Sequence, residues 1–271
     1  MKIVCISDTH NLHRAMPIPD GDILIHAGDI TVAGDAREVA DFNTWLGTLP
    51  HKHKVVVAGN HDFCFEKSPQ KTQALLTNAH YLQDSGVEIE GLFIWGSPIS
   101  PKYHDWAFNR ERGSDIRRHW KIIPPHTDVL ITHCPPFGIL DTSSQGTHEG
   151  CRDLLDILQH RVRPRLHVFG HIHEAHGHTT IGHTQYVNAS IVGQKDWSRR
   201  YWLLRQFTQF SIRLFRLFQW LRSLIWKTPP EHLHSSALSQ YQWKVVHAAI
   251  VVETALPSIH PNFRAPSKSP L

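Results

Sequence analysis

Short apolar runs recur along the chain, and polar residues follow each of them directly. The runs occupy positions 3–6, 23–25, 55–57, 92–95, 129–131, 166–169 and 186–187. Continuous runs of this kind, rich in Val and Ile, are typical of strands that are buried on both faces. Between the runs, residues 36–47 and 149–158 place apolar side chains at helical spacing. Strands that alternate with helices predict an α/β protein, in which ligands bind beyond the carboxyl ends of the strands.

The residues that follow these runs carry the chemistry of a metal site. They are Asp8 and His10, Asp29, Asn60, His133, and His171 with His173. Carboxylate oxygens mixed with imidazole nitrogens suit divalent transition metals such as Mn, Fe or Zn. Seven ligands are too many for one tetrahedral ion. They suffice for two ions if one carboxylate bridges them, and two-metal sites are a common device for cleaving phosphoesters.

Turn chemistry is the alternative explanation for each of these motifs taken singly. The chain has 23 His, so one histidine is weak evidence for a metal ligand. Gly, Asn and Asp are also common in turns. However, five such motifs follow one another in order, each at the end of a predicted strand. This repetition favours a metal centre over a series of unrelated turns.

Longer stretches around the motifs resemble a known family. The stretches are ISDTHNLH, DGDILIHAGDIT, VVVAGNHD, DWAFNRERG and HVFGHIHEAHG. They are similar to the calcineurin-like metallophosphoesterase superfamily, in the branch of the vertebrate brain metallophosphoesterase-domain proteins and their bacterial relatives, near the class III cyclic nucleotide phosphodiesterases. The resemblance covers roughly residues 1–195 and implies a four-layer α/β/β/α sandwich. The alternation of strands and helices alone does not distinguish this sandwich from a doubly wound sheet.

The resemblance also implies a role for each polar residue. Asp8, His10 and His173 would hold a first metal ion, and Asn60, His133 and His171 a second. Asp29 would bridge the two ions, for which Mn is favoured, and a metal-bridging hydroxide would attack phosphorus. His61 would stay off the metals, contact a phosphate oxygen and help to stabilise or protonate the leaving alkoxide. Asp62 would either orient His61 or make a turn contact.

A loop at residues 96–113 is expected to form part of a substrate wall, because long loops that follow strands are often functional. Trp106 and Phe108 could stack on a base, or they could fill the core beneath the loop. Asn109 and Arg110 could hold phosphate, Arg110 through its fork of donors. Residues 132–141 and 146–151 predict a second wall, in which His148 is a candidate substrate contact.

The end of the chain departs from the resemblance. We expect a phosphoesterase domain over 1–195, a basic amphipathic helix over 196–227 and a weakly ordered tail over 228–271. Apolar residues recur in steps of three and four from 203 to 224, among many Arg. Residues 199–226 suit a membrane surface or a protein partner. Docking onto the chain's own domain and an accidental extension without function are the alternatives.

Composition and charge limit the remaining choices. Residues 197–271 contain ten basic and two acidic residues, so the net charge of +4 belongs to the tail. The main domain is therefore not expected to bind nucleic acid specifically. Four Cys do not predict a disulfide framework, and no signal peptide is visible, so a cytoplasmic protein is expected. Residues 199–226 would allow it to attach peripherally to a membrane.

The predicted activity is hydrolysis of a small phosphodiester, such as a cyclic nucleotide, by a metal-dependent phosphoric ester hydrolase. A phosphomonoesterase or a nuclease on the same metal core is the alternative within the enzymes. A scaffold protein with an inactive site is the alternative from another class. The presence of all seven expected ligands and of His61 favours the enzyme. The sequence leaves the oligomeric state open.

Overall fold

A computed structural model of the chain describes residues 1–194, 243–245 and 247–253. The chain divides into two compact units, Met1–Gly193 with Val245–Leu271, and Gln194–Lys244. The amphipathic helix predicted over 196–227 lies outside the described residues, and so does the predicted domain boundary at 195. Within the part that is described, no helix is both long and apolar enough to cross a membrane.

The first sheet of the larger unit is a mostly parallel sheet with the order β15-β1-β2-β3-β4. Its strands are β1 (Lys2–Ile6), β2 (Ile23–His26), β3 (His53–Val56), β4 (His80–Tyr81) and β15 (Ile250–Glu253). Strands β1 to β4 run parallel, and β15 pairs antiparallel with β1. The carboxyl ends of β1, β2 and β3 therefore meet at one edge of this sheet.

The second sheet has the order β11-β12-β10-β9-β6-β5. Its strands are β5 (Ser85–Ile89), β6 (Leu92–Ser97), β9 (Val129–Thr132), β10 (Leu166–Phe169), β11 (Gly177–Ile181) and β12 (Thr184–Asn188). The four central strands run parallel, and an antiparallel strand closes each edge. Like the first sheet, it presents several carboxyl ends together.

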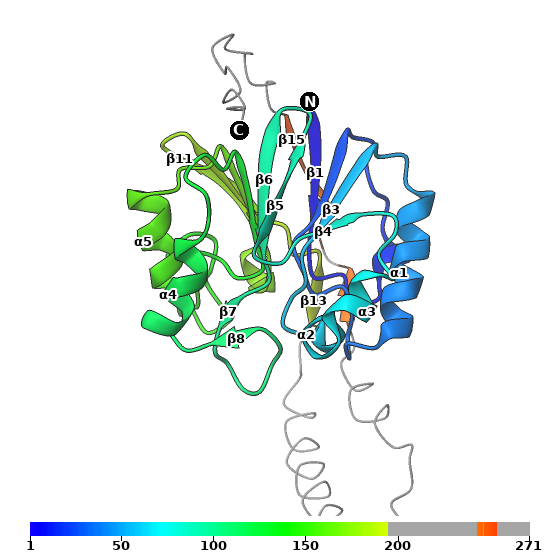
Figure 1. Cartoon of the computed structure of the whole chain (residues 1–271), viewed down its shortest axis with the longest axis horizontal. Coiled ribbons are helices and arrows are strands. Elements are labelled where there is room, and N and C mark those ends of the chain that lie inside the picture. The colour runs from blue at the N-terminus through cyan, green and yellow to red at the C-terminus, as the bar shows by residue number, and fades with distance from the viewer. Residues whose placement is uncertain (195–242, 246, 254–271) are drawn as a thin grey trace, which may run out of the picture. The chain divides into compact units, whose positions relative to one another are not determined.

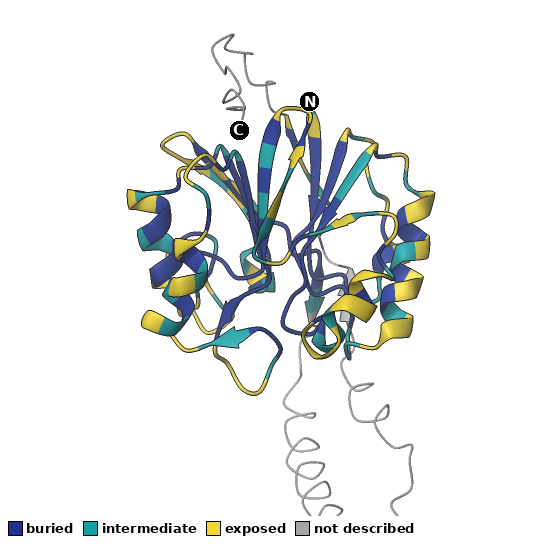
Figure 2. Cartoon of the chain, viewed as in Figure 1, coloured by how far each residue is buried: buried dark blue, intermediate teal, exposed yellow. Residues whose placement is uncertain are grey.

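Helices cover the outer faces of the two sheets (Figure 1). The helices α1 (Ala36–Thr48), α2 (Phe63–Lys67) and α3 (Pro69–Gln73) lie beside the first sheet, and α4 (Ser114–Lys121) and α5 (Arg152–His160) beside the second. Figure 2 shows that the helices turn their buried residues toward the sheets and their exposed residues outward. This is the predicted four-layer α/β/β/α sandwich, and the prediction is confirmed.

The remaining short elements lie in the connections. They are the 3-10 helices η1 (His13–Ala15) and η2 (His173–Ala175), and the strands β7 (Ser100–Pro101), β8 (Asn109–Arg110), β13 (Val192–Gln194) and β14 (Trp243–Val245). Strands β7 and β8 pair in parallel within the loop that was predicted as a substrate wall.

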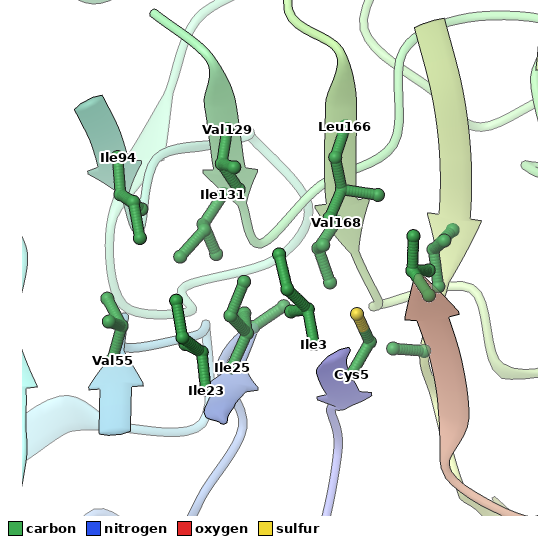
Figure 3. Packing of buried hydrophobic residues seen from close by; sticks show 14 of the residues in the cluster. Ile3, Cys5, Ile23, Ile25, Val55, Ile94, Val129, Ile131, Leu166 and Val168 are labelled. Atoms are coloured by element: carbon green, nitrogen blue, oxygen red, sulfur yellow. The ribbon is translucent and has the colours of Figure 1, made fainter. Parts of the chain in front are cut away.

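The core between the sheets follows a period of two along each strand (Figure 3). Ile3 and Cys5 of β1 point into this core, and the alternate residues Val4 and Ile6 are buried on the other face of the sheet. The same alternation brings in residues from both sheets, among them Ile23, Ile25, Val55, Ile94, Val129, Ile131, Leu166 and Val168. Both faces of the central strands are thus covered, which explains their uninterrupted apolar sequence.

The helix α1 shows how the local sequence sets one boundary of this fold. Asp35 caps the helix by accepting a hydrogen bond from the amide of Arg37, and Glu38 completes a capping box. The helix buries Val39 and Phe42 with Trp45 and Leu46, the stripe that was expected over 36–47. The other predicted helix, over 149–158, is present as α5 with bounds shifted by two or three residues.

Two described strands, β14 and β15, lie within residues 228–271, which the sequence predicts as a weakly ordered tail. Strand β15 pairs with β1 from Lys2 to Cys5, and Val252 joins the core between the sheets. The apolar residues at 249–252 form the edge strand β15. The sequence alone did not identify this strand, because its partner is the first strand of the chain. The remainder of 228–271 lies mostly outside the described residues.

Candidate metal centre

The seven residues predicted as metal ligands follow the carboxyl ends of five strands. Asp8 and His10 follow β1, Asp29 follows β2, and Asn60 follows β3 in the first sheet; His133 follows β9, and His171 and His173 follow β10 in the second. Five of them are buried, and His171 and His173 are partly exposed. Contacts between these loops bring side chains of both sheets to one place.

The loops hold several of these residues in an unusual backbone conformation. The φ angles are 55° at Asp8, 41° at His10, 55° at Asp29 and 72° at His171. Residues other than glycine seldom adopt positive φ, and they do so where the surroundings over-determine the conformation. The surroundings here include hydrogen bonds from the amide of Asp8 to Gly28 O at 2.8 Å and from the amide of His10 to Asp29 O at 3.1 Å.

The Asp8 carboxylate joins the first sheet to the loop after β10. It accepts hydrogen bonds from the backbone amide of His171 at 3.1 and 3.2 Å and from the Ser190 hydroxyl at 2.8 Å, and His173 Nε2 lies 3.1 Å away. Burial by itself would raise the pKa of Asp8, but the charge and hydrogen bond of His173 outweigh it and hold the pKa well below its usual range. Asp8 is therefore an ionised, well-oriented ligand candidate.

Asp29 lies between histidines from the two sheets. Its Oδ1 accepts a hydrogen bond from the backbone amide of His61 at 2.8 Å and lies 3.5 Å from His133 Nε2. Its Oδ2 lies 3.8 Å from His10 Nε2. Burial opposes ionisation of Asp29, yet the neighbouring histidines, His133 first, hold the pKa well below its usual value. This central position is the one that the predicted bridging carboxylate requires.

Backbone carbonyls fix the orientation of two candidate ligand rings. His10 Nδ1 faces Thr31 O at 3.2 Å, and His133 Nδ1 faces Ala27 O at 3.0 Å. Because a carbonyl only accepts, each Nδ1 carries the proton, and each Nε2 is directed to the carboxylates. Histidine ligands of metal ions are commonly held in this way through their second nitrogen.

Asn60 and His133 form a second focus of donor atoms. Asn60 Oδ1 lies 2.8 Å from His133 Nε2, and the rings of His133 and His171 are 5.0 Å apart. Burial lowers the pKa of His133, but the negative charge of Asp29 outweighs burial and raises it to about 9. The negative charge of Asp29 that raises this pKa also favours a cation at the position.

The donor atoms fit a divalent metal centre. Among the described residues, three groups have ligand atoms within 4.8 Å of one another: Asp8 with His10 and His173, His10 with Asp29 and His61, and Asp8 with Asp29 and His133. Together they offer two carboxylates and imidazoles, the donors that Mn, Fe and Zn accept. The groups share Asp8, His10 and Asp29, so they form one continuous cluster.

His61 lies beside this cluster and belongs to one of its groups. Its Nδ1 faces Val32 O at 2.9 Å, so Nε2 is the ring nitrogen that is left to contact a metal ion or a substrate. The ring packs edge-on against His10 and Trp106, with centroid distances of 4.7 and 4.0 Å. Burial lowers the pKa of His61, which favours a neutral ring. That His61 stays off the metals, as the resemblance implies, stays a prediction.

Asp62, whose role the sequence left open, connects the loops after β2 and β3. Its carboxylate accepts hydrogen bonds from the amides of Gly59 at 2.8 Å, Ile30 at 3.2 Å and Thr31 at 2.9 Å, and from the Thr31 hydroxyl at 2.7 Å. Burial and the charge of Asp29 raise the pKa of Asp62 to about 7. The turn contact with Gly59 is present, and the additional contacts hold the loop of Asp29 in place.

The predicted substrate residues in the loop 96–113 have different surroundings. Trp106 is half-buried with its ring on His61, so it lies at the candidate centre. Phe108 is buried, which supports the alternative that it fills the core. Asn109 Nδ2 donates to Tyr103 O and His104 O at 3.1 and 3.0 Å. Arg110 Nε donates to His119 Nε2 of α4 at 3.2 Å, so Asn109 braces the loop internally and Arg110 ties the loop to α4.

The second predicted wall also has its own internal structure. His148 Nδ1 lies 2.7 Å from the buried Asp141 carboxylate, and the His148 side chain is half-exposed. A bridge between Thr142 and His148 brings the stretches 132–141 and 146–151 together. The side chain of Asn188 donates to Leu140 O at 3.0 Å and to Ile172 O at 2.8 Å, which ties this wall to the loop of His171 and His173.

Sequence reasoning missed Ser190 and two glycines that shape the centre. Ser190 follows β12 in the stretch VNAS and donates to Asp8. A Cβ on Gly170 would collide with the side chains of Asp8 and Ser7, and a Cβ on Gly59 would collide with Asp29. The position of Gly59 and Gly170 directly after predicted strands could have indicated their role, because only glycine allows another chain segment to approach the backbone so closely.

The fold and the cluster of candidate metal ligands agree with one protein family. The family model of the calcineurin-like phosphoesterases matches residues 1–175. The chain belongs to the calcineurin-like phosphoesterase family, whose members use divalent metals to hydrolyse phosphoesters. The resemblance seen in the sequence is thereby confirmed.

Relatives extend the match beyond the family model. The chain is 44% identical over 214 residues to metallophosphoesterase domain-containing protein 1 of Homo sapiens, which covers 70% of this chain and 66% of the relative. It is also 44% identical over 218 residues to UPF0046 protein C25E10.12 of Caenorhabditis elegans, covering 72% and 76%. The chain thus spans just under two thirds of the human relative. Among solved structures, TT1561 of Thermus thermophilus matches with a TM-score of 0.48 and 14% identity, over 69% of this chain and 88% of that one.

Proposed function

We propose that the chain hydrolyses a small phosphodiester, such as a cyclic nucleotide, with two divalent metal ions for which Mn is favoured. The observation that carries the proposal is the position of Asp29. Its two oxygens face His10 of the first sheet and His133 of the second, at 3.8 and 3.5 Å. A carboxylate between two sets of donors is what a bridging ligand needs.

In this proposal the two sets of ligands lie on either side of Asp29. Asp8, His10 and His173 would hold one ion, and Asn60, His133 and His171 would hold the other. Two bound cations would supply Lewis acidity toward the phosphoryl oxygens and would lower the pKa of a bound water. The neutral amide of Asn60 limits the negative charge of the second set, so an anionic substrate is not repelled.

His61 would act on the leaving oxygen through Nε2. Because Val32 O accepts the hydrogen on Nδ1, a neutral His61 presents Nε2 as an acceptor. The ring must therefore take up a proton at Nε2 before it can protonate the leaving alkoxide as the ester P–O bond breaks. The charge of Asp29 favours this protonated ring, although burial opposes it.

The surroundings of the centre favour a small diester with an aromatic leaving group or base. Trp106 offers an indole ring beside His61, at a centroid distance of 4.0 Å. Residues 1–196 carry 18 basic and 22 acidic residues, so the domain offers no general attraction to a polyanion such as nucleic acid.

The proposal is tested with metal-free protein to which Mn²⁺ is added back. We expect hydrolysis of bis-p-nitrophenyl phosphate with a higher kcat/KM than hydrolysis of p-nitrophenyl phosphate. A preference for the monoester would instead assign a phosphomonoesterase. Protein that binds Mn²⁺ but hydrolyses neither compound would support a scaffold and would contradict the proposal.

A further inference from the structure

Each sheet of the larger unit contains a buried histidine that the catalytic proposal does not use. His26 is the last residue of β2, three residues before Asp29, and His167 lies in β10, four residues before His171. Both side chains are completely buried. Their sequence neighbours Ile25, Ala27, Leu166 and Val168 belong to the core between the sheets, so alternation along the strand places both rings on the opposite face. A polar ring in such a place is costly unless its nitrogens are used.

Both rings use Nε2 to contact the hydroxyl of a threonine at or just beyond the carboxyl end of the neighbouring strand. His26 Nε2 lies 3.0 Å from Thr9 Oγ1, and His167 Nε2 lies 2.8 Å from Thr132 Oγ1. Thr9 stands between Asp8 and His10, and Thr132 stands directly before His133. Both threonines are completely buried as well. The same arrangement therefore occurs once in each sheet, at the base of loops that carry candidate ligands.

The direction of the hydrogen bonds follows from the partners. Around His26, the amide of Gly28 donates to Nδ1 at 3.2 Å, so the proton of the neutral ring is on Nε2, which donates to Thr9 Oγ1. The Thr9 hydroxyl then donates to Ile30 O at 3.4 Å. The chain of bonds begins and ends in the loop of Asp29 and passes through the loop of Asp8 and His10.

The second sheet repeats this direction. The Thr132 hydroxyl donates to Cys134 O at 2.7 Å, so its oxygen accepts from His167 Nε2. The hydrogen bond from Thr132 to Cys134 O spans His133, so it holds the backbone on both sides of this candidate ligand. Burial lowers the pKa of both His26 and His167 to about 3, which keeps the rings neutral and preserves the Nε2 proton as a donor.

We propose that these two histidine–threonine pairs, His26 with Thr9 and His167 with Thr132, are positioning residues for the metal centre. They act through the loops and do not touch a metal or the substrate. The strained φ angles of Asp8, His10 and Asp29 need surroundings that over-determine them. The pair of His26 and Thr9 links the loop of Asp8 and His10 to the loop of Asp29. The inference rests on the metal centre proposed above.

The test removes each threonine hydroxyl and restores it. Thr9→Val and Thr132→Val keep the shape of the side chain but leave a histidine N–H without its acceptor, whereas Thr9→Ser and Thr132→Ser retain the hydroxyl. Metal-free protein is titrated with Mn²⁺ by calorimetry. We expect the Val variants to bind Mn²⁺ about 10- to 100-fold more weakly, as is usual for residues that orient metal ligands, and the Ser variants to bind nearly as the unchanged protein does.

Thr184→Val is the matched control. Thr184 is buried, and its hydroxyl donates to Pro164 O at 2.6 Å, but it lies at the amino end of β12, away from the candidate ligands. Its loss should lower the Tm and leave Mn²⁺ affinity unchanged. Thr9→Val and Thr132→Val proteins that bind Mn²⁺ as tightly as Thr184→Val would overturn the inference. Unchanged protein that binds no Mn²⁺ would instead contradict the proposed function.

A second pair of variants decides the question if a Val variant fails to fold. His167→Gln retains an amide N–H close to the place of Nε2, whereas His167→Leu has a similar volume and cannot donate. We expect His167→Gln to bind Mn²⁺ at least tenfold more tightly than His167→Leu. Equal affinities of these two proteins would overturn the inference for the second sheet.

Discussion

Gly170→Ala should damage the metal centre without adding or removing a single ligand. The added Cβ would lie well under 3.0 Å from Asp8 Oδ2 and Ser7 Oγ, whereas ordinary contacts are about 3.5–4.0 Å, so a displacement on the order of 1 Å is needed. The Asp8 carboxylate cannot yield freely, because Ser190 Oγ holds it at 2.8 Å and the amide of His171 holds it at 3.1 Å.

The size of the effect follows from this displacement. Overpacking costs about 1–3 kcal/mol of folding stability. A misplacement of about 1 Å in a catalytic constellation costs roughly 100-fold in rate. We therefore expect Gly170→Ala to lower kcat/KM for bis-p-nitrophenyl phosphate about 100-fold and to weaken Mn²⁺ binding at least about tenfold.

The assay compares Gly170→Ala with Gly182→Ala in Mn²⁺ titrations, hydrolysis rates and Tm. Gly182 has a φ of +62° and open space around the added Cβ, so its replacement strains the backbone and displaces no ligand. Both variants should lose stability, but only Gly170→Ala should lose metal affinity. Normal Mn²⁺ binding and turnover by Gly170→Ala would refute the reasoning that Asp8 is a ligand held in place by this close approach.

Three further predictions address single residues. Asp29→Ala should lower metal content and reduce activity by orders of magnitude, because the two cations would lose their shared anion; retention of two ions with near-normal turnover would argue against the bridge. His61→Ala should lower kcat about 10²–10⁴-fold with metal content unchanged, and more strongly for diesters with poor leaving groups; equal losses for good and poor leaving groups would limit His61 to positioning. His167 has a pKa of about 3 when folded, below its ordinary 6.5, so stability should fall by about 1.4 kcal/mol per pH unit below 6.5 because the unfolded chain takes up the proton first. Between pH 6.5 and pH 5, the free energy of unfolding measured with urea should therefore fall by about 2 kcal/mol less in His167→Gln than in the unchanged protein. Equal decreases in the two proteins would contradict a buried neutral ring.

The central strands could be predicted from the sequence because both of their faces are buried. β1, β2, β9 and β10 are mostly apolar and rich in Val, Ile and Leu, and residues after parallel strands meet at one edge of a sheet. Two of the edge strands could not be predicted in this way. β4 has two residues, and β11 is Gly177–Ile181 with polar residues at 178–180, so neither has an apolar pattern of its own.

The candidate ligands could be predicted for the same reason, whereas their supports could not. Asp62, Ser190 and Asn188 act through contacts between loops that are far apart in the chain, which the sequence does not display. Asn109 and Arg110 look like phosphate ligands in the sequence. Their partners, Tyr103 O within the loop and His119 in α4, become visible only in the folded structure.

The most direct test of the metal centre is an anomalous diffraction measurement on crystals grown with Mn²⁺. We predict two peaks about 3.5–4 Å apart. One should lie among Asp8, His10 and His173, and the other among Asn60, His133 and His171, with Asp29 contacting both. A single peak, or peaks away from these residues, would contradict the account.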